Sequence, residues 1–180
     1  MLEEIKVFRR ATIASIITSA YPMIVVGGYF GITPWNMKRL SIDETDLSFS
    51  ILIFGVFFVI SNQIAGRILV PKYGTKLVMS LAFPLITFST LLAIISPTYF
   101  YFLLTFISAG IGWGASGPIG GIHCQLIEKH FKKIITPYYA MGFNIGILVG
   151  GGLAGVIMKY NFEPYIFFII LSFSSILVAI

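Results

Sequence analysis

The sequence predicts an all-α membrane protein with six transmembrane helices in one domain, residues 1–180. Two observations carry this prediction. Leu77–Ile127 is a run of 51 residues that contains no Asp, Glu, Lys or Arg. The whole chain is 57% hydrophobic and only 11% charged, whereas an average soluble domain is about 25% charged. We therefore expect the chain to lie in a lipid bilayer.

The length of the uncharged run indicates how the helices are spaced. A helix needs about 20 apolar residues to cross about 30 Å of hydrocarbon, so Leu77–Ile127 suffices for two crossings. Ser96-Pro97-Thr98 is the expected turn between them, because Pro and Ser interrupt helices. Each crossing must be helical, since lipid offers no partners to the backbone. We expect helices near 11–32, 46–68, 77–96, 98–122, 137–158 and 164–180.

The first, second and sixth segments have distinctive ends. The first apolar run exceeds the roughly 7–15 residues of a signal peptide and further crossings follow it, so we expect it to be retained. Asp46 is a suitable N-cap for the second helix. The sixth helix has sixteen residues from Tyr165, or about 24 Å, and no Lys or Arg follows it. This ending favours a truncated product or a gene fragment.

The distribution of basic residues predicts the orientation. Nine of the twelve Lys and Arg residues lie in the N-terminus and in the connections after the second and fourth helices, and three lie on the other side. Lys and Arg accumulate in cytoplasmic loops, so we expect a multi-pass protein of the plasma or inner membrane with a cytoplasmic N-terminus. The net charge of +5 has the same explanation, and no nucleic-acid partner is expected.

The sequence offers little support for catalysis. The single cysteine, Cys124, excludes an internal disulfide and a cysteine metal cluster. We find no nucleotide-binding glycine loop, no nucleophile constellation and no metal-ligand spacing. An intramembrane enzyme would need buried His, Asp or Glu groups, and His123 is the only candidate. We therefore expect no enzyme activity, no cofactor and no metal.

A short motif after the second helix carries a family resemblance. Gly66 is followed by Pro71-Lys72-Tyr73-Gly74-Thr75-Lys76. This segment resembles the tight cytoplasmic loop of the major facilitator superfamily of transporters, Asp-Arg-x-Gly-x-Arg/Lys, which follows a helix that ends in Gly. Lys72, Gly74 and Lys76 match, and Pro71 occupies the acidic position. Gly74 permits a turn with positive φ, and the lysines hold the loop in the cytoplasm.

Glycines in the fourth and fifth helices extend the resemblance to the sugar-efflux and fucose-permease-like branch. Helix packing is the simpler explanation for Gly142/Gly146/Gly150 and for Gly151/Gly155, because small residues four apart let backbones approach closely. The fourth helix carries a denser cluster together with Pro118. There a bent helix beside a substrate cavity is the alternative.

The resemblance implies a function. The chain would be the N-terminal half of a secondary transporter, built from two inverted three-helix repeats, that moves a small solute by alternating access. Its partners would be the solute, the lipid bilayer and a missing C-terminal half. The alternative is a six-helix accessory or assembly subunit of another membrane complex. The sequence shows neither an Arg in the fourth helix nor a carboxylate at mid-membrane depth, so it gives no support for proton coupling.

Three residues are the candidate solute contacts. The resemblance implies that the first, second, fourth and fifth helices line a central cavity. Tyr21, Trp113 and Asn144 lie near mid-depth on these helices, and polar or large aromatic groups there belong toward protein or a wet cavity. We expect the three side chains to share one face. Packing and hydrogen bonds within the protein are the alternatives for each.

Overall fold

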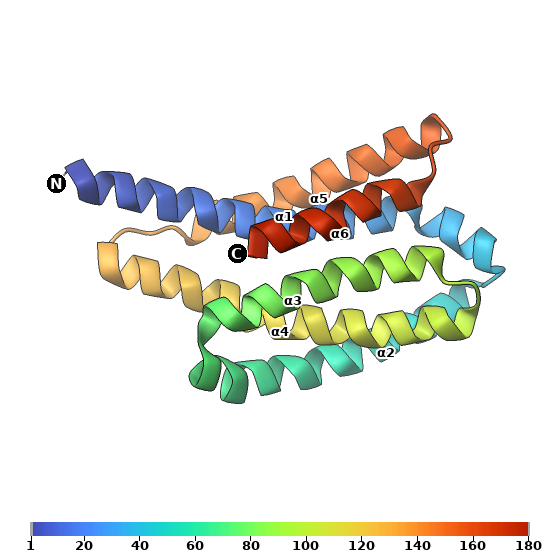
Figure 1. The fold of residues 1–180 in the computed structure, drawn as a ribbon, viewed down its shortest axis with the longest axis horizontal. Coiled ribbons are helices and arrows are strands. Elements are labelled where there is room, and N and C mark those ends of the chain that lie inside the picture. Colours follow the sequence, from blue (N-terminus) through green and yellow to red (C-terminus); the bar gives the residue numbers. More distant parts are fainter. Residues whose placement is uncertain (1, 180) are drawn as a thin grey trace.

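The computed structural model describes residues 2–179, in which every regular element is a helix (Figure 1). The all-α prediction is confirmed. The elements in chain order are α1 (Leu2–Leu40), α2 (Glu44–Ile64), the π-helix η1 (Ala65–Leu69), α3 (Val70–Ile95), α4 (Tyr99–Phe131), α5 (Thr136–Lys159) and α6 (Pro164–Ala179).

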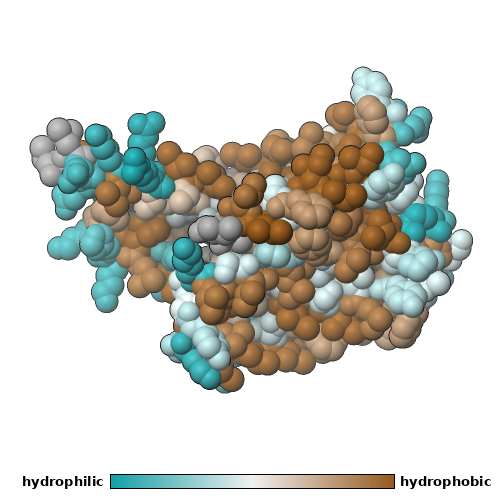
Figure 2. Space-filling model, in the orientation of Figure 1, coloured by the Kyte–Doolittle hydropathy of each residue, from teal (hydrophilic) through white to brown (hydrophobic). Residues whose placement is uncertain are grey.

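The surface and the helix lengths are those of a membrane protein. Four helical runs are long and apolar enough to cross a bilayer, namely Glu3–Leu40, Glu44–Ile95, Tyr99–Phe131 and Thr136–Lys159, and Pro164–Leu177 is apolar but shorter. Large apolar side chains lie on the outside, with Leu148 76% exposed. Figure 2 shows hydrophobic residues across the middle of the molecule and hydrophilic residues toward its ends. These features indicate a multi-pass membrane protein.

The helices pack in a definite pattern of neighbours. Helix α1 lies along α5, α2 lies along α4, and α3 packs against both α4 and α6 (Figure 1). The connections that follow α1, α3 and α5 lie at one end of the bundle. The N-terminus, the reversal between α2 and α3, and the α4–α5 connection lie at the other end.

Three glycines let α5 approach the backbone of α1. Gly142, Gly146 and Gly150 are buried and face α1. A Cβ atom built on Gly142 would lie 2.6 Å from the carbonyl oxygen of Ile16, and one on Gly150 would lie 2.8 Å from the amide nitrogen of Gly28. Real side chains do not tolerate such distances, so the predicted packing role of this triad is confirmed.

The second predicted pair on α5 has no such role. A Cβ atom on Gly151 would make only an ordinary contact at 3.7 Å with the carbonyl oxygen of Gly27, and one on Gly155 would meet nothing within 4 Å. The expectation of close packing at Gly151/Gly155 is wrong. These residues lie on another side of α5, because four-residue spacing defines a stripe without telling which way it faces.

Glycines on α4 serve two neighbouring helices. Gly110 and Gly114 face α2, and a Cβ atom on Gly110 would lie 2.6 Å from the carbonyl oxygen of Phe54. Gly112 faces α3, and a Cβ atom on Gly112 would lie 3.1 Å from the amide nitrogen of Ile86. Close packing on two sides therefore accounts for this part of the glycine cluster.

Several helices extend beyond the predicted spans. Helix α1 has 39 residues against a prediction of 11–32, and α4 has 33 against 98–122. At about 1.5 Å per residue both exceed 30 Å of hydrocarbon, so their ends project from it. Charged residues mark where the apolar layer ends without ending the helix, because Glu, Lys and Arg favour helix. The predicted span 137–158 agrees with α5 within one residue at each end.

The second helical segment continues past its predicted end at residue 68. The chain stays helical past Gly66, through the π-helix η1, and reverses direction only near Gly74 (Figure 1). Gly74 has φ 79° and ψ 162°, which confirms the predicted positive φ. A glycine is tolerated inside a helix, whereas this left-handed conformation requires one. The N-cap of α2 is Asp43, and Asp46 is its partner at the third position of a capping box.

The connection between α4 and α5 is tied down by a carboxylate. Helix α4 continues beyond the predicted span, through Glu128 and as far as Phe131. Glu128 accepts hydrogen bonds from the backbone N–H of Ile135 at 2.8 Å and from the N–H and hydroxyl of Thr136 at 2.9 and 2.8 Å. These donors at the start of α5 hold the pKa of Glu128 below its usual value of 4.5.

This contact predicts a pH-dependent connection between α4 and α5. Because the folded-state pKa is depressed, the carboxylate stabilises the connection above the unfolded pKa, and that stabilisation is lost as the pH falls through the folded pKa. Amide exchange at Ile135 and Thr136, corrected for its intrinsic pH dependence, should accelerate over this acidic range. Glu128→Gln should accelerate it already at neutral pH, and Glu163→Gln should not. Equal exchange in all three proteins would contradict the role of Glu128.

Candidate functional site

A partly open cleft of about 500 Å³ lies between α1 and α4. Helices α2 and α5 flank it with residues such as Phe54 and Phe143, and α3 closes it from behind with Ser89, Thr90 and Ala93. None of its lining residues belongs to α6. The volume falls within the roughly 300–1,000 Å³ typical of small-molecule sites.

The wall of the cleft is rich in aromatic rings. Tyr29 meets Phe106 edge-on with 6.2 Å between ring centroids, and Phe54 stacks on Phe58 at 5.9 Å. The aromatic lining residues are Tyr29, Phe30, Phe54, Phe58, Phe106, Trp113 and Phe143. Such a wall offers flat apolar surfaces from several directions.

The serine and threonine hydroxyl groups of the wall already form hydrogen bonds within the protein. Thr33, Thr90 and Thr105 each donate to a carbonyl one turn earlier in their own helix, at 2.6–2.9 Å. Ser89 shares a hydrogen bond of 2.8 Å with Ser108. None of the lining residues carries a charge. The cleft therefore presents mainly carbon atoms to an occupant.

The structure places the three predicted solute contacts in different surroundings. Trp113 lines the cleft. The Tyr21 hydroxyl donates to the carbonyl of Leu171 on α6 and lies 2.7 Å from the Ser174 hydroxyl. Asn144 is exposed on α5 and donates to the carbonyl of Ala140 at 3.0 Å. The expectation that the three share one face is therefore wrong.

The three residues were predicted from their depth in the membrane alone, and depth does not determine the direction of a side chain. Position in the sequence gave the level of each residue in the membrane, whereas the direction of a side chain around the helix depends on which neighbours pack there. Most cleft residues are aromatic or aliphatic and gave no polar signal. A helical spacing was present in Thr105, Ala109 and Trp113, which are four residues apart on one face of α4.

The predicted loop motif lies outside the cleft lining. Gly66 faces α4, with 3.8 Å from a hypothetical Cβ atom to the Cβ of Pro118. Lys72 and Lys76 are exposed, and the Lys72 ammonium lies 5.1 Å from the ring centroid of Tyr73. The motif thus shapes the reversal at Gly74 rather than a binding surface in the cleft.

A polar cluster lies near the C-terminus of α1. The Arg39 guanidinium donates to Asn36 Oδ1 at 2.8 and 3.1 Å and to the carbonyl of Ser96 at 2.7 Å. Asn36 is 1% exposed and donates to the carbonyl of Ala93 at 3.4 Å. The cluster satisfies free carbonyls at the C-terminus of α3 and fixes α1 to it. The nearby Tyr29 hydroxyl is buried beside Asn36.

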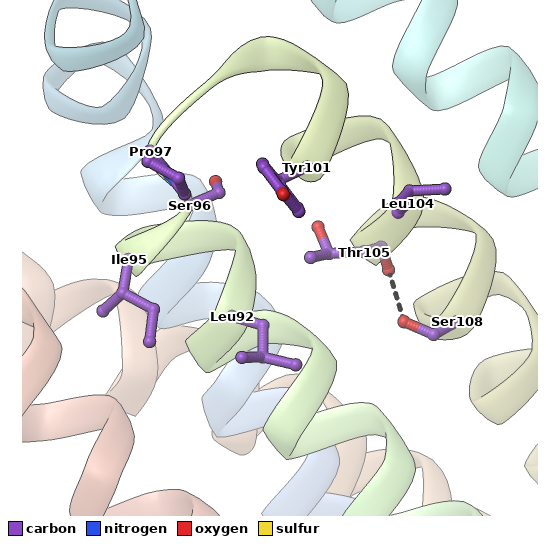
Figure 3. Close-up of a pocket in the computed structure, with 8 residues that line it drawn as sticks. All are labelled: Leu92, Ile95, Ser96, Pro97, Tyr101, Leu104, Thr105 and Ser108. Atoms are coloured by element: carbon purple, nitrogen blue, oxygen red, sulfur yellow. Dashed lines mark hydrogen bonds between the residues drawn. The ribbon is translucent and has the colours of Figure 1, made fainter.

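A second hollow of about 360 Å³ is more local. Figure 3 shows this hollow, which is lined by Leu92 and Ile95 of α3 and by Tyr101, Leu104 and Thr105 of α4, with the α3–α4 turn at one end. Only these two helices and their connection line it. The cleft, which five helices build, is the better candidate for a functional site.

The cleft is large enough for a small molecule, and its lining residues include no His, Cys, Asp, Glu, Lys or Arg. No group of three or more His, Cys, Asp or Glu residues in residues 2–179 could hold a metal ion. Compared with known proteins, the chain matches no family model and no curated protein.

Proposed function

We propose that the chain is the N-terminal six-helix half of a secondary transporter of the major facilitator type, which moves a small solute by alternating access. The observation that carries this proposal is the cleft between α1 and α4, flanked by α2 and α5. In such transporters the solute site lies near the midplane between two six-helix units. A cleft with α3 behind it and with no lining residue from α6 is the share of that site that one unit supplies.

An internal repeat in the packing supports the proposal. Exchanging the first three helices with the last three converts the α1–α5 pair into the α4–α2 pair, and both pairs are principal contacts of the bundle. Gly27 and Gly31 of α1 face α5, and Gly110 and Gly114 of α4 face α2. Equivalent glycine pairs, four residues apart, therefore occupy equivalent helices. Inverted three-helix repeats have this relation.

The partly open cleft also implies a partner. Alternating access requires a second unit that moves against the first around the site. We propose a second six-helix unit as that partner, whether on the same polypeptide or on another. We expect the 180-residue chain alone, reconstituted in vesicles, to show no saturable flux of sugars, amino acids or organic solutes. Saturable flux from the chain alone would favour a pair of identical chains.

A substitution that fills the cleft tests the proposed transport function. In cells that produce the protein at the full length of its gene, Ala109→Phe should abolish saturable solute flux without lowering membrane abundance, because the new ring occupies the cleft. Ile111→Phe is the matched control on the exposed side of α4, and it should transport normally. If no solute in the panel is moved and the protein copurifies with a stable membrane complex, the accessory-subunit alternative replaces the proposal.

A further inference from the structure

The chemistry of the cleft points to a class of solute. We propose that the cleft, the share of the site that this chain supplies, binds uncharged, apolar ring compounds and neither sugars nor organic cations. This inference rests on the proposed function for its meaning, since it names the kind of solute surface that this unit would contact. It departs from the sugar branch that the glycine pattern resembles.

Hydrogen-bonding capacity excludes a polyhydroxyl solute from this wall. A sugar loses its water on binding and needs donors and acceptors in return, because an unpaired buried hydroxyl costs free energy. The hydroxyls of Thr33, Thr90 and Thr105 are turned to their own helices. The Tyr29 hydroxyl is buried beside Asn36 and Arg39 and has negligible accessible surface, so it cannot replace them.

The aromatic wall favours a ring-shaped occupant, and the absence of acidic lining residues favours a neutral ring over a cationic one. Seven aromatic side chains converge on about 500 Å³ and offer edge and face contacts to another ring. The same faces attract cations. However, a buried cation without a carboxylate partner pays a large desolvation cost, and none of the lining residues is acidic. A neutral ring compound meets every condition.

Two isosteric probes test the inference by direct binding. The chain has two tryptophans, so a Trp35→Phe variant leaves Trp113 in the cleft as the only indole reporter. The chain in lipid nanodiscs is titrated with tert-butylbenzene, with trimethylphenylammonium and with glucose while Trp113 emission is recorded. We expect saturable binding of tert-butylbenzene, binding of the cation weaker by at least about tenfold, and no response to glucose.

Two substitutions separate binding in the cleft from partition into lipid. Ala109→Phe should remove saturable binding, because it fills the cleft, whereas Ile111→Phe should leave it unchanged. If Ala109→Phe and Ile111→Phe respond alike, tert-butylbenzene only dissolves in the bilayer and the inference fails.

The other outcomes are equally decisive. Tighter binding of trimethylphenylammonium would make the cleft a cation site, and a saturable response to glucose would restore the sugar assignment. Absence of all binding would mean that lipid chains or packing fill the space. Each of these results overturns the solute class without touching the transport proposal, which flux measurements decide. Conversely, probe binding without flux would retain the site and reject the transporter.

Discussion

Adding one methyl group at Gly146 should disrupt the bundle, whereas adding the same group at Gly152 should not. A Cβ atom at Gly146 would collide with the carbonyl oxygen of Ala20 and would lie 2.7 Å from the Cβ of Met23. Neither atom can yield easily, because α1 backbone and the root of a side chain form the contact. We expect Gly146→Ala to destabilise the chain by about 1–3 kcal/mol, the usual range for overpacking, or more.

The matched control uses the same residue type in the same helix. A Cβ atom at Gly152 would meet nothing within 4 Å, so Gly152→Ala should be neutral or should stabilise α5 by about 0.5–1 kcal/mol. Unfolding of both variants by SDS in mixed micelles, followed by circular dichroism, measures the difference. Equal midpoints for the two variants would show that α1 and α5 do not approach as closely as the structure has them.

The sequence was sufficient for the helical class and for most turns. Uncharged runs located the apolar segments, and the turn at Ser96-Pro97-Thr98 and the positive φ of Gly74 follow from the chemistry of Pro and Gly. Helix ends were less predictable, because a hydropathy boundary marks the edge of lipid rather than the end of the helix. The α4 extension to Phe131 is an example, since Glu128 acts there through contacts with the next helix.

The cleft was predictable only in outline. The family resemblance indicated which helices would line it, and Trp113 does so. The facing directions of Tyr21 and Asn144 depend on packing with α6 and α1, which a single sequence does not reveal. Rings such as Phe54 and Phe143 carry no distinguishing signal in the sequence, because an apolar side chain is equally stable in lipid and in an apolar cleft.

Reporter fusions should reveal a strictly alternating topology with a cytoplasmic N-terminus. Alkaline phosphatase, active only outside the cytoplasm, should be active when fused after Ile42 or Phe162 and inactive after Gly74 or Lys133. A fluorescent protein that folds only in the cytoplasm should give the opposite pattern. The expected contrast is between full and background activity, because each fusion point lies wholly on one side of the membrane.

Contacts in the structure place the basic segments on one side, as an alternating topology requires. Phe8 near the N-terminus meets Phe131 with 5.4 Å between centroids, and the Lys133 ammonium lies 4.9 Å from the Phe8 ring. The basic N-terminus and the basic α4–α5 connection are therefore neighbours at one end, which must be on one side of the membrane. At the other end, Arg39 is held by backbone carbonyls and so has a structural reason to be there.

The fusion pattern also tests the proposed alternating-access mechanism. If the pattern is reversed, the basic end faces outward, which would contradict the positive-inside rule. If fusions after Ile42 and Gly74 report the same side, then Glu44–Ile95 does not cross twice, and the paired arrangement of α2 with α4 cannot exist in a bilayer. The proposed inverted repeat that relates α1–α5 to α4–α2 would then be lost, and with it the support for the proposed alternating access. The packing requires Ile42 and Phe162 to report one side of the membrane and Gly74 and Lys133 to report the other.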